Sequence, residues 1–143
     1  MLIYSKILSV IGLLNLVLCS GFSLYYNVRP ADFADGTALN SLAYLIGFGG
    51  FFVMMVLLAV YYALLGEKRE DLLTFNPLNI TLYIVFTVNL IYRLILDSRI
   101  PVSGSATPSK VGTFLALALY VNVTTVTVAI NYIKGVKAGK LRE

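Results

Sequence analysis

Four long apolar stretches dominate the pattern of hydrophobic and polar positions along this chain. They cover residues 7–26, 41–65, 78–96 and 111–133, and the second contains no charged residue. A stretch of about 18 or more apolar residues is long enough to cross a hydrocarbon core about 30 Å thick. The pattern therefore predicts an all-α integral membrane bundle of four transmembrane helices with short loops, forming a single transmembrane domain.

Proline and glycine positions predict several boundaries between these helices. Asn76 precedes Pro77 and Thr107 precedes Pro108, and a capping side chain followed by proline is typical of a helix start. The pair Asp35-Gly36 predicts a turn between the first two helices. The third and fourth helices are thus expected to begin at these prolines.

The composition agrees with a membrane location. Of the 143 residues, 59% are hydrophobic and 13% are charged, whereas an ordinary soluble domain is about 25% charged. We expect an integral, multi-pass protein of a plasma or inner membrane, surrounded by the lipid bilayer. We also expect the first stretch to be a retained helix and not a cleaved signal peptide, because it continues for about 20 apolar residues.

Basic residues predict the orientation of the bundle. If both termini are inside, seven basic residues lie on the inner side and four on the outer side, and cytoplasmic loops usually carry the excess. We therefore expect N-in and C-in. The inner set is Lys6, Lys68, Arg69, Lys134, Lys137, Lys140 and Arg142, and the outer set is Arg29, Arg93, Arg99 and Lys110.

Several kinds of chemistry lack their usual residues. The chain has no histidine and a single cysteine, Cys19, inside the first apolar stretch, so haem ligation and a thiolate metal cluster are disfavoured. There is no glycine-rich nucleotide motif, and the basic residues at the membrane edges do not indicate nucleic-acid binding. We expect no catalytic residue, cofactor or metal; bound lipid is expected, and a pigment is disfavoured without being excluded.

Three polar residues lie at intervals of four along the third predicted helix: Asn89 and Arg93 within the apolar stretch and Asp97 directly after it. Arg93 lies about 22 Å along a helix that begins near residue 78, which is close to one membrane boundary. There an arginine can extend to the interface, and Asp97 one turn further can reduce its cost. We favour an interfacial anchor or an intrahelical pair; the alternative is a row that faces a cavity, a partner subunit or a substrate.

The fourth stretch carries the longest polar face. Steps of seven, four, three and four residues place its members on one side of a helix: Thr113, Tyr120, Thr124, Thr127 and Asn131. In lipid, such groups usually bond their own preceding carbonyl or a neighbouring helix. We favour helix packing, and the alternative is the lining of a path for a polar solute.

Small residues predict close helix packing elsewhere. The first predicted helix carries a small-residue face that begins just before its apolar stretch, and the second has two glycines one turn apart. Small residues let helix backbones approach closely. These residues are Ser5, Ser9, Gly12, Cys19 and Ser23 with Asn15 beside them, and Gly47 and Gly50. Aromatic residues near the ends predict interfacial belts, with Tyr25, Tyr26 and Phe33 on one side and Tyr4, Tyr61, Tyr62, Phe75 and Tyr132 on the other.

Three functional hypotheses follow. The first is a non-catalytic accessory or structural subunit of a larger integral membrane complex, in energy transduction or transport, whose small and polar helix faces contact other membrane subunits. The second is a small homo-oligomeric transporter or channel, in which Thr124, Thr127 and Asn131, or Asn89 and Arg93, line a path. The third is a small membrane enzyme that acts on lipid, with Arg93 as a head-group binder. We favour the first.

Overall fold

The computed structural model describes residues 2–29, 32, 36–66, 77–99 and 111–139, with the backbone alone for residues 96–99. It forms four helices, and each contains one of the expected spans. They are α1 (Leu2–Val28), α2 (Ala38–Leu65), α3 (Pro77–Arg99) and α4 (Val111–Lys137). All four are long and apolar enough to cross a membrane. The expected all-α bundle of four transmembrane helices is therefore confirmed, and the chain is a multi-pass membrane protein.

Local sequence explains several helix ends. The backbone N–H of Asn40 donates to the Thr37 hydroxyl at 3.1 Å, which caps the start of α2. Gly66 ends α2 with a φ of 59°, a conformation that favours glycine. The expected start of α3 at Pro77 is confirmed, whereas the expected start at Thr107 and Pro108 lies outside the described residues.

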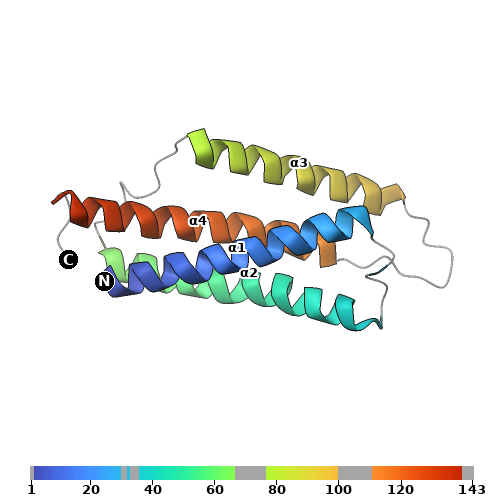
Figure 1. The fold of residues 1–143 in the computed structure, drawn as a ribbon, viewed down its shortest axis with the longest axis horizontal. Coiled ribbons are helices and arrows are strands. Elements are labelled where there is room, and N and C mark those ends of the chain that lie inside the picture. Colours follow the sequence, from blue (N-terminus) through green and yellow to red (C-terminus); the bar gives the residue numbers. More distant parts are fainter. Residues whose placement is uncertain (1, 30–31, 33–35, 67–76, 100–110, 140–143) are drawn as a thin grey trace.

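The helices are antiparallel in sequence order, and α4 lies at their centre. In Figure 1, α4 runs between α3 on one side and the pair α1 and α2 on the other, and both chain ends lie at the same end of the bundle. In an apolar segment of 18 residues in α4, 61% of the residues are buried, whereas in the corresponding segments of the other three helices 17–22% are buried. The other helices therefore assemble on α4, which forms the core of the bundle.

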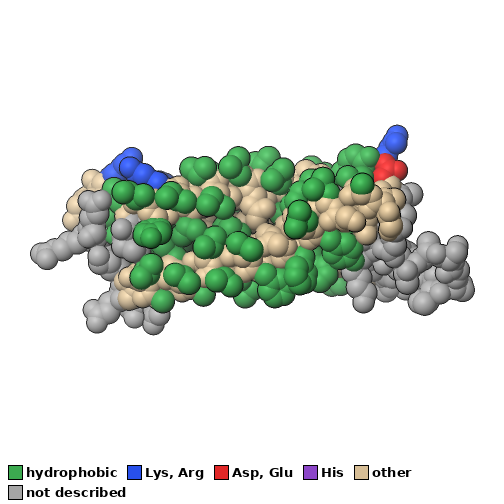
Figure 2. Space-filling view, turned by 90° about the horizontal axis from the view of Figure 1, so that it is seen from below, with side chains coloured by type: hydrophobic (Ala, Val, Ile, Leu, Met, Phe, Trp, Pro, Cys, Tyr) green, Lys and Arg blue, Asp and Glu red, His purple; other side chains and the backbone are tan. Residues whose placement is uncertain are grey.

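The outer surface is apolar along most of its length. On the face shown in Figure 2, hydrophobic side chains cover the middle of the molecule, and Lys and Arg side chains lie at the two ends. Large apolar residues such as Val17, Val56 and Val88 are more than half exposed. Such a surface suits contact with lipid and not with water.

The small-residue face of α1 is buried against the other helices of the bundle. Ser5, Ser9, Gly12, Cys19 and Ser23 are all buried. A Cβ atom at Gly12 would lie 2.7 Å from Cγ2 of Val126, closer than real Cβ contacts, and a Cβ at Gly47 of α2 would lie 3.2 Å from the Leu115 backbone nitrogen. Both glycines therefore allow helix approaches that a larger residue would obstruct.

Three tyrosines that were expected in interfacial belts lie in the core instead. Tyr26, Tyr61 and Tyr132 are 4%, 2% and 0% exposed. Tyr61 shares a hydrogen bond with Ser5, and its ring meets the Tyr132 ring edge to face at 6.4 Å. The Tyr61 hydroxyl can be buried because Ser5 is its polar partner. Position near a helix end therefore did not determine the exposure of these three residues. Tyr4 and Tyr25 are exposed, as a belt requires, and Phe33 and Phe75 lie outside the described residues.

Candidate functional site

Polar residues of α3 and α4 meet in a reciprocal set of contacts. The Tyr120 hydroxyl donates to Thr87 at 2.8 Å, and the hydroxyls of Tyr83 and Thr124 lie 2.6 Å apart. Each threonine donates to the carbonyl oxygen of the tyrosine four residues before it on its own helix. Because a threonine hydroxyl has one hydrogen, Tyr83 is the donor to Thr124. We call these four side chains the tyrosine–threonine clasp.

The clasp belongs to a longer contact between the two helices. The rings of Tyr83 and Tyr120 are stacked with centroids 6.2 Å apart and an interplanar angle of 15°. Nearer the chain termini, Thr127 donates to Oδ1 of Asn79 at 3.2 Å. The hydroxyls of the candidate residues Tyr120, Thr124 and Thr127 therefore all make hydrogen bonds to side chains of α3.

Asn89 connects α3 with α1 at the other end of the bundle. Its amide nitrogen donates to the Ser23 hydroxyl at 3.1 Å, and its Oδ1 accepts from Nδ2 of Asn27 at 2.8 Å. Oδ1 of Asn27 is buried and has no hydrogen-bond partner among the described residues. We call Asn27 and Asn89 the amide row. One of its acceptors has no partner among the described residues, and an unsatisfied buried acceptor costs about 1–3 kcal/mol.

Arg93 lies inside the bundle, and the expectation that it extends to the interface is wrong. Its side chain is 2% exposed. The guanidinium carbon lies 4.7 Å from the ring centroid of Tyr26 and 5.1 Å from that of Tyr92. Rotation of α3 places the residue against α1 and α4, and depth along the helix alone could not reveal this.

Close packing around Arg93 depends on Gly112 at the start of α4. A Cβ atom there would lie 2.7 Å from the Tyr26 ring and 3.2 Å from Cδ of Arg93. Within the described part of the chain, Nε and Nη2 of Arg93 have no hydrogen-bond partner. The expected pair with Asp97 cannot be placed, because the Asp97 side chain lies outside the described residues.

Two cavities lie between α1 and α3, and residues of α4 also line both of them. Near the amide row, Ser20, Ser23, Asn27 and Asn89 line a cavity of about 190 Å³ together with apolar neighbours. We call it the outer cavity. Nearer the chain termini lies a second cavity of about 230 Å³, which we call the inner cavity. The two helices flank α4 without close backbone contact with each other, and we call the surface between them, which contains both cavities, the groove.

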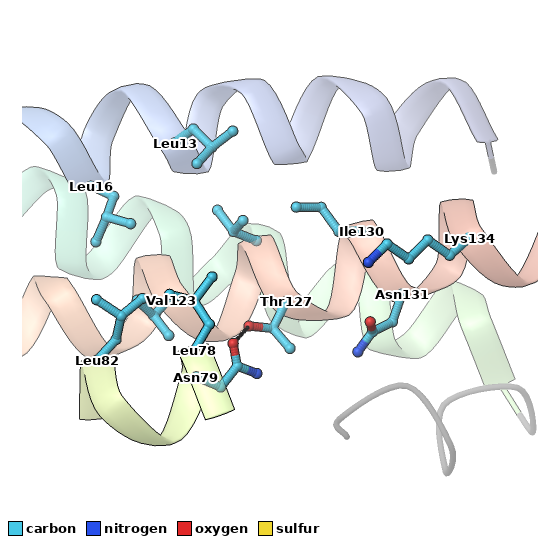
Figure 3. Close-up of a pocket in the computed structure, with 11 residues that line it drawn as sticks. Leu13, Leu16, Leu78, Asn79, Leu82, Val123, Thr127, Ile130, Asn131 and Lys134 are labelled. Atoms are coloured by element: carbon cyan, nitrogen blue, oxygen red, sulfur yellow. Dashed lines mark hydrogen bonds between the residues drawn. The ribbon is translucent and has the colours of Figure 1, made fainter. Parts of the chain in front are cut away.

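The remaining candidate residue, Asn131, lines the inner cavity. Figure 3 shows it beside Thr127 on α4, with Lys134 one turn further. The Lys134 side chain extends along α4 toward Ile130. The sequence indicated Asn131 as part of a polar face, but it indicated Lys134 only as a topology residue and not as part of a cavity.

A hydrogen bond between two asparagines joins α1 to α4, and this pair was not predicted from the sequence. Nδ2 of Asn15 donates to Oδ1 of Asn122 at 3.2 Å, and Nδ2 of Asn122 donates to the Ala118 carbonyl at 2.8 Å. Asn122 is fully buried. Asn15 also lies against Gly50, where a Cβ atom would be 2.7 Å from its amide nitrogen. Helices α1, α2 and α4 thus meet at the pair formed by Asn15 and Asn122.

The described residues contain no group of three or more His, Cys, Asp or Glu that could hold a metal ion. Comparison with family models, with curated proteins and with solved structures found no match to this chain. The candidate site is therefore the groove, whose polar side chains at the outer cavity are Ser20, Ser23, Asn27 and Asn89. Arg93 is buried beside Tyr26 and does not line this cavity.

Proposed function

We propose that this chain is a non-catalytic subunit of a larger integral membrane complex. In this proposal a transmembrane helix of another protein packs over the groove between α1 and α3, and only its side chains enter the outer cavity. The chain then contributes a binding surface, and any chemistry or transport belongs to the complex.

The observation that carries the proposal is the composition of the outer cavity. Ser20 and Ser23 are small, so another backbone could approach closely, and Asn27 and Asn89 supply amide groups at the same place. Interfaces between membrane helices are enriched in such small and polar residues. Oδ1 of Asn27, which lacks a partner among the described residues, could accept a bond from that helix.

The state of the polar face on α4 also supports a subunit more than a conducting chain. Tyr120, Thr124 and Thr127 bond to α3, so these hydroxyls hold the bundle together. A solute path through one copy would need them to face water. We therefore keep the homo-oligomeric transporter as the outcome that would replace the proposal.

The test is extraction of the tagged chain in mild detergent, followed by native mass measurement and identification of proteins present at fixed ratio. We expect distinct proteins, and we expect Ser20→Phe to reduce their yield at least fivefold by filling the cavity. Val56→Phe is the matched control, because Val56 is 61% exposed on α2, away from the groove.

The other outcomes are equally informative. If the native particle contains copies of this chain alone, the subunit proposal is wrong and liposome flux becomes the next measurement. If partner proteins co-purify but Ser20→Phe and Val56→Phe retain them equally, the chain is a subunit that does not use this groove.

A further inference from the structure

The inner cavity has apolar walls from three helices. Leu13 and Leu16 of α1 face Leu78 and Leu82 of α3, and residues of α4 form its floor (Figure 3). The lining of α4 extends from Val123 to Lys134, which is about 16 Å at 1.5 Å per residue. This is about half of a hydrocarbon core about 30 Å thick, so the cavity is about one leaflet deep.

One end of this cavity is polar and cationic. Lys134 lines it at the end nearest the chain termini and is exposed, and Asn131 lies one turn deeper. The polar atoms of Thr127 and Asn79 still deeper bond to each other. An occupant therefore meets a cation at the mouth and hydrocarbon below it.

The dimensions favour a lipid chain over a protein helix. A volume of about 230 Å³ along this length is narrow, whereas a helix with its side chains is about 10–12 Å across. An acyl chain is narrow and flexible enough to enter between α1 and α3. The membrane also supplies such chains at the open side of the groove.

We propose that the inner cavity binds one acyl chain of an anionic phospholipid, whose phosphate group pairs with Lys134. The basic residues predict that this end faces the cytoplasm, where anionic lipids are concentrated and each nearby lysine contributes about 1 kcal/mol of attraction. The site is separate from the proposed partner surface at the outer cavity. The result for this lipid site is therefore independent of the result for the subunit proposal.

The experiment uses the full purified chain in mild detergent. Native mass spectrometry would compare retention of phosphatidylglycerol and of phosphatidylcholine with the same acyl chains. We expect one tightly retained phosphatidylglycerol per chain and weaker retention of phosphatidylcholine. Lys134→Gln should weaken phosphatidylglycerol binding about fivefold. Lys137→Gln removes the same charge from the same helix end but not from the cavity lining, and should have little effect.

Filling the cavity tests the acyl-chain part of the proposal. Leu16→Phe should reduce retention of both lipids at least fivefold, whereas Leu14→Phe, at a residue of α1 that is 62% exposed, should not. Leu82→Phe fills the same cavity from α3 and replaces Leu16→Phe if that variant does not fold by circular dichroism. Equal losses for Lys134→Gln and Lys137→Gln, or unchanged retention in a folded cavity-filling variant, would overturn the proposal.

Discussion

The two sides of α4 are packed by different means. On one side, α1 and α2 approach closely at Gly12 and Gly47, and Asn15 pairs with Asn122 within that tight contact. On the other side, α3 is held by stacked tyrosines and hydroxyl bonds, and cavities remain beside it. Small residues therefore let α1 and α2 pack closely on α4, and we call this contact the dense side, although a shallow cavity of about 320 Å³ lies outside that contact, beside α1 and Leu39 of α2. Helix α3 instead meets α4 through longer polar side chains.

This difference assigns separate tasks to the two sides. Lipid tails are as apolar as the helix surfaces, so the hydrophobic effect contributes little to the association of helices in a bilayer. Close packing and interhelical hydrogen bonds therefore stabilise the bundle. Under the two proposals, the dense side supplies stability, and the α3 side supplies the surfaces that a partner helix and a lipid occupy. Substitutions on the dense side should chiefly change unfolding, and those in the groove should chiefly change binding.

The largest expected effect is that of Gly12→Leu on the dense side. Even a Cβ atom would lie 2.7 Å from Val126, so leucine must displace α1 or α4. We expect a loss of about 1–3 kcal/mol, typical of overpacking, in unfolding by SDS in mixed micelles. Gly21→Leu is the control, because a Cβ at Gly21 would have no neighbour within 4 Å among the described residues. Equal losses for the two variants would contradict the close approach of α1 to α4.

The next largest effect should come from the asparagine pair. Asn15→Ala and Asn122→Ala each remove one side of the contact, and a double-mutant cycle isolates their coupling. Interhelical hydrogen bonds in membranes average about 0.6 kcal/mol and reach about 1.7 kcal/mol. We expect the upper part of this range because Asn122 is fully buried. Additive losses in the same SDS unfolding measurement would show that the contact contributes nothing as a pair.

A smaller effect is expected from the tyrosine–threonine clasp. The reciprocal bonds predict that Thr87→Val and Thr124→Val destabilise the bundle by similar amounts, each about 0.6 kcal/mol. Thr125→Val is the matched control, since its hydroxyl donates to the Val121 carbonyl on its own helix. Thermal unfolding in detergent measures all three. If Thr125→Val costs as much as Thr124→Val, the contact between α3 and α4 is not the cause.

The sequence was sufficient for the parts of the fold that depend on hydropathy and residue size. Apolar length located the four helices, and the small face of α1 predicted its buried side. The sequence also contains a pattern that indicates the clasp, since a threonine follows four residues after Tyr83 and again four residues after Tyr120. Two such repeats on antiparallel helices can satisfy each other.

Helix rotation and neighbours could not be derived in the same way. Tyr26 and Arg93 both lie near helix ends, where aromatic and basic side chains usually meet the interface. In this bundle each is buried by the other and by Gly112, a contact between three helices distant in sequence. No periodicity within one helix contains that information. The cavities were missed for the same reason, since each is lined from α1, α3 and α4 together.

For Arg93→Met two opposing contributions nearly cancel, so the net change in stability is expected to be close to zero. Loss of the contact with Tyr26 removes about 2 kcal/mol at a desolvated site, and removal of buried N–H groups without described partners returns about 1–3 kcal/mol. Because methionine has a similar length and is apolar, we expect the free energy of unfolding to change by less than about 1 kcal/mol. A loss above about 3 kcal/mol would instead indicate a charge partner outside the described side chains, with Asp97 the first to test. If stability is unchanged while co-purified partners are lost, Arg93 is retained for binding, and the polar end of α3 belongs with the groove and not with the dense side.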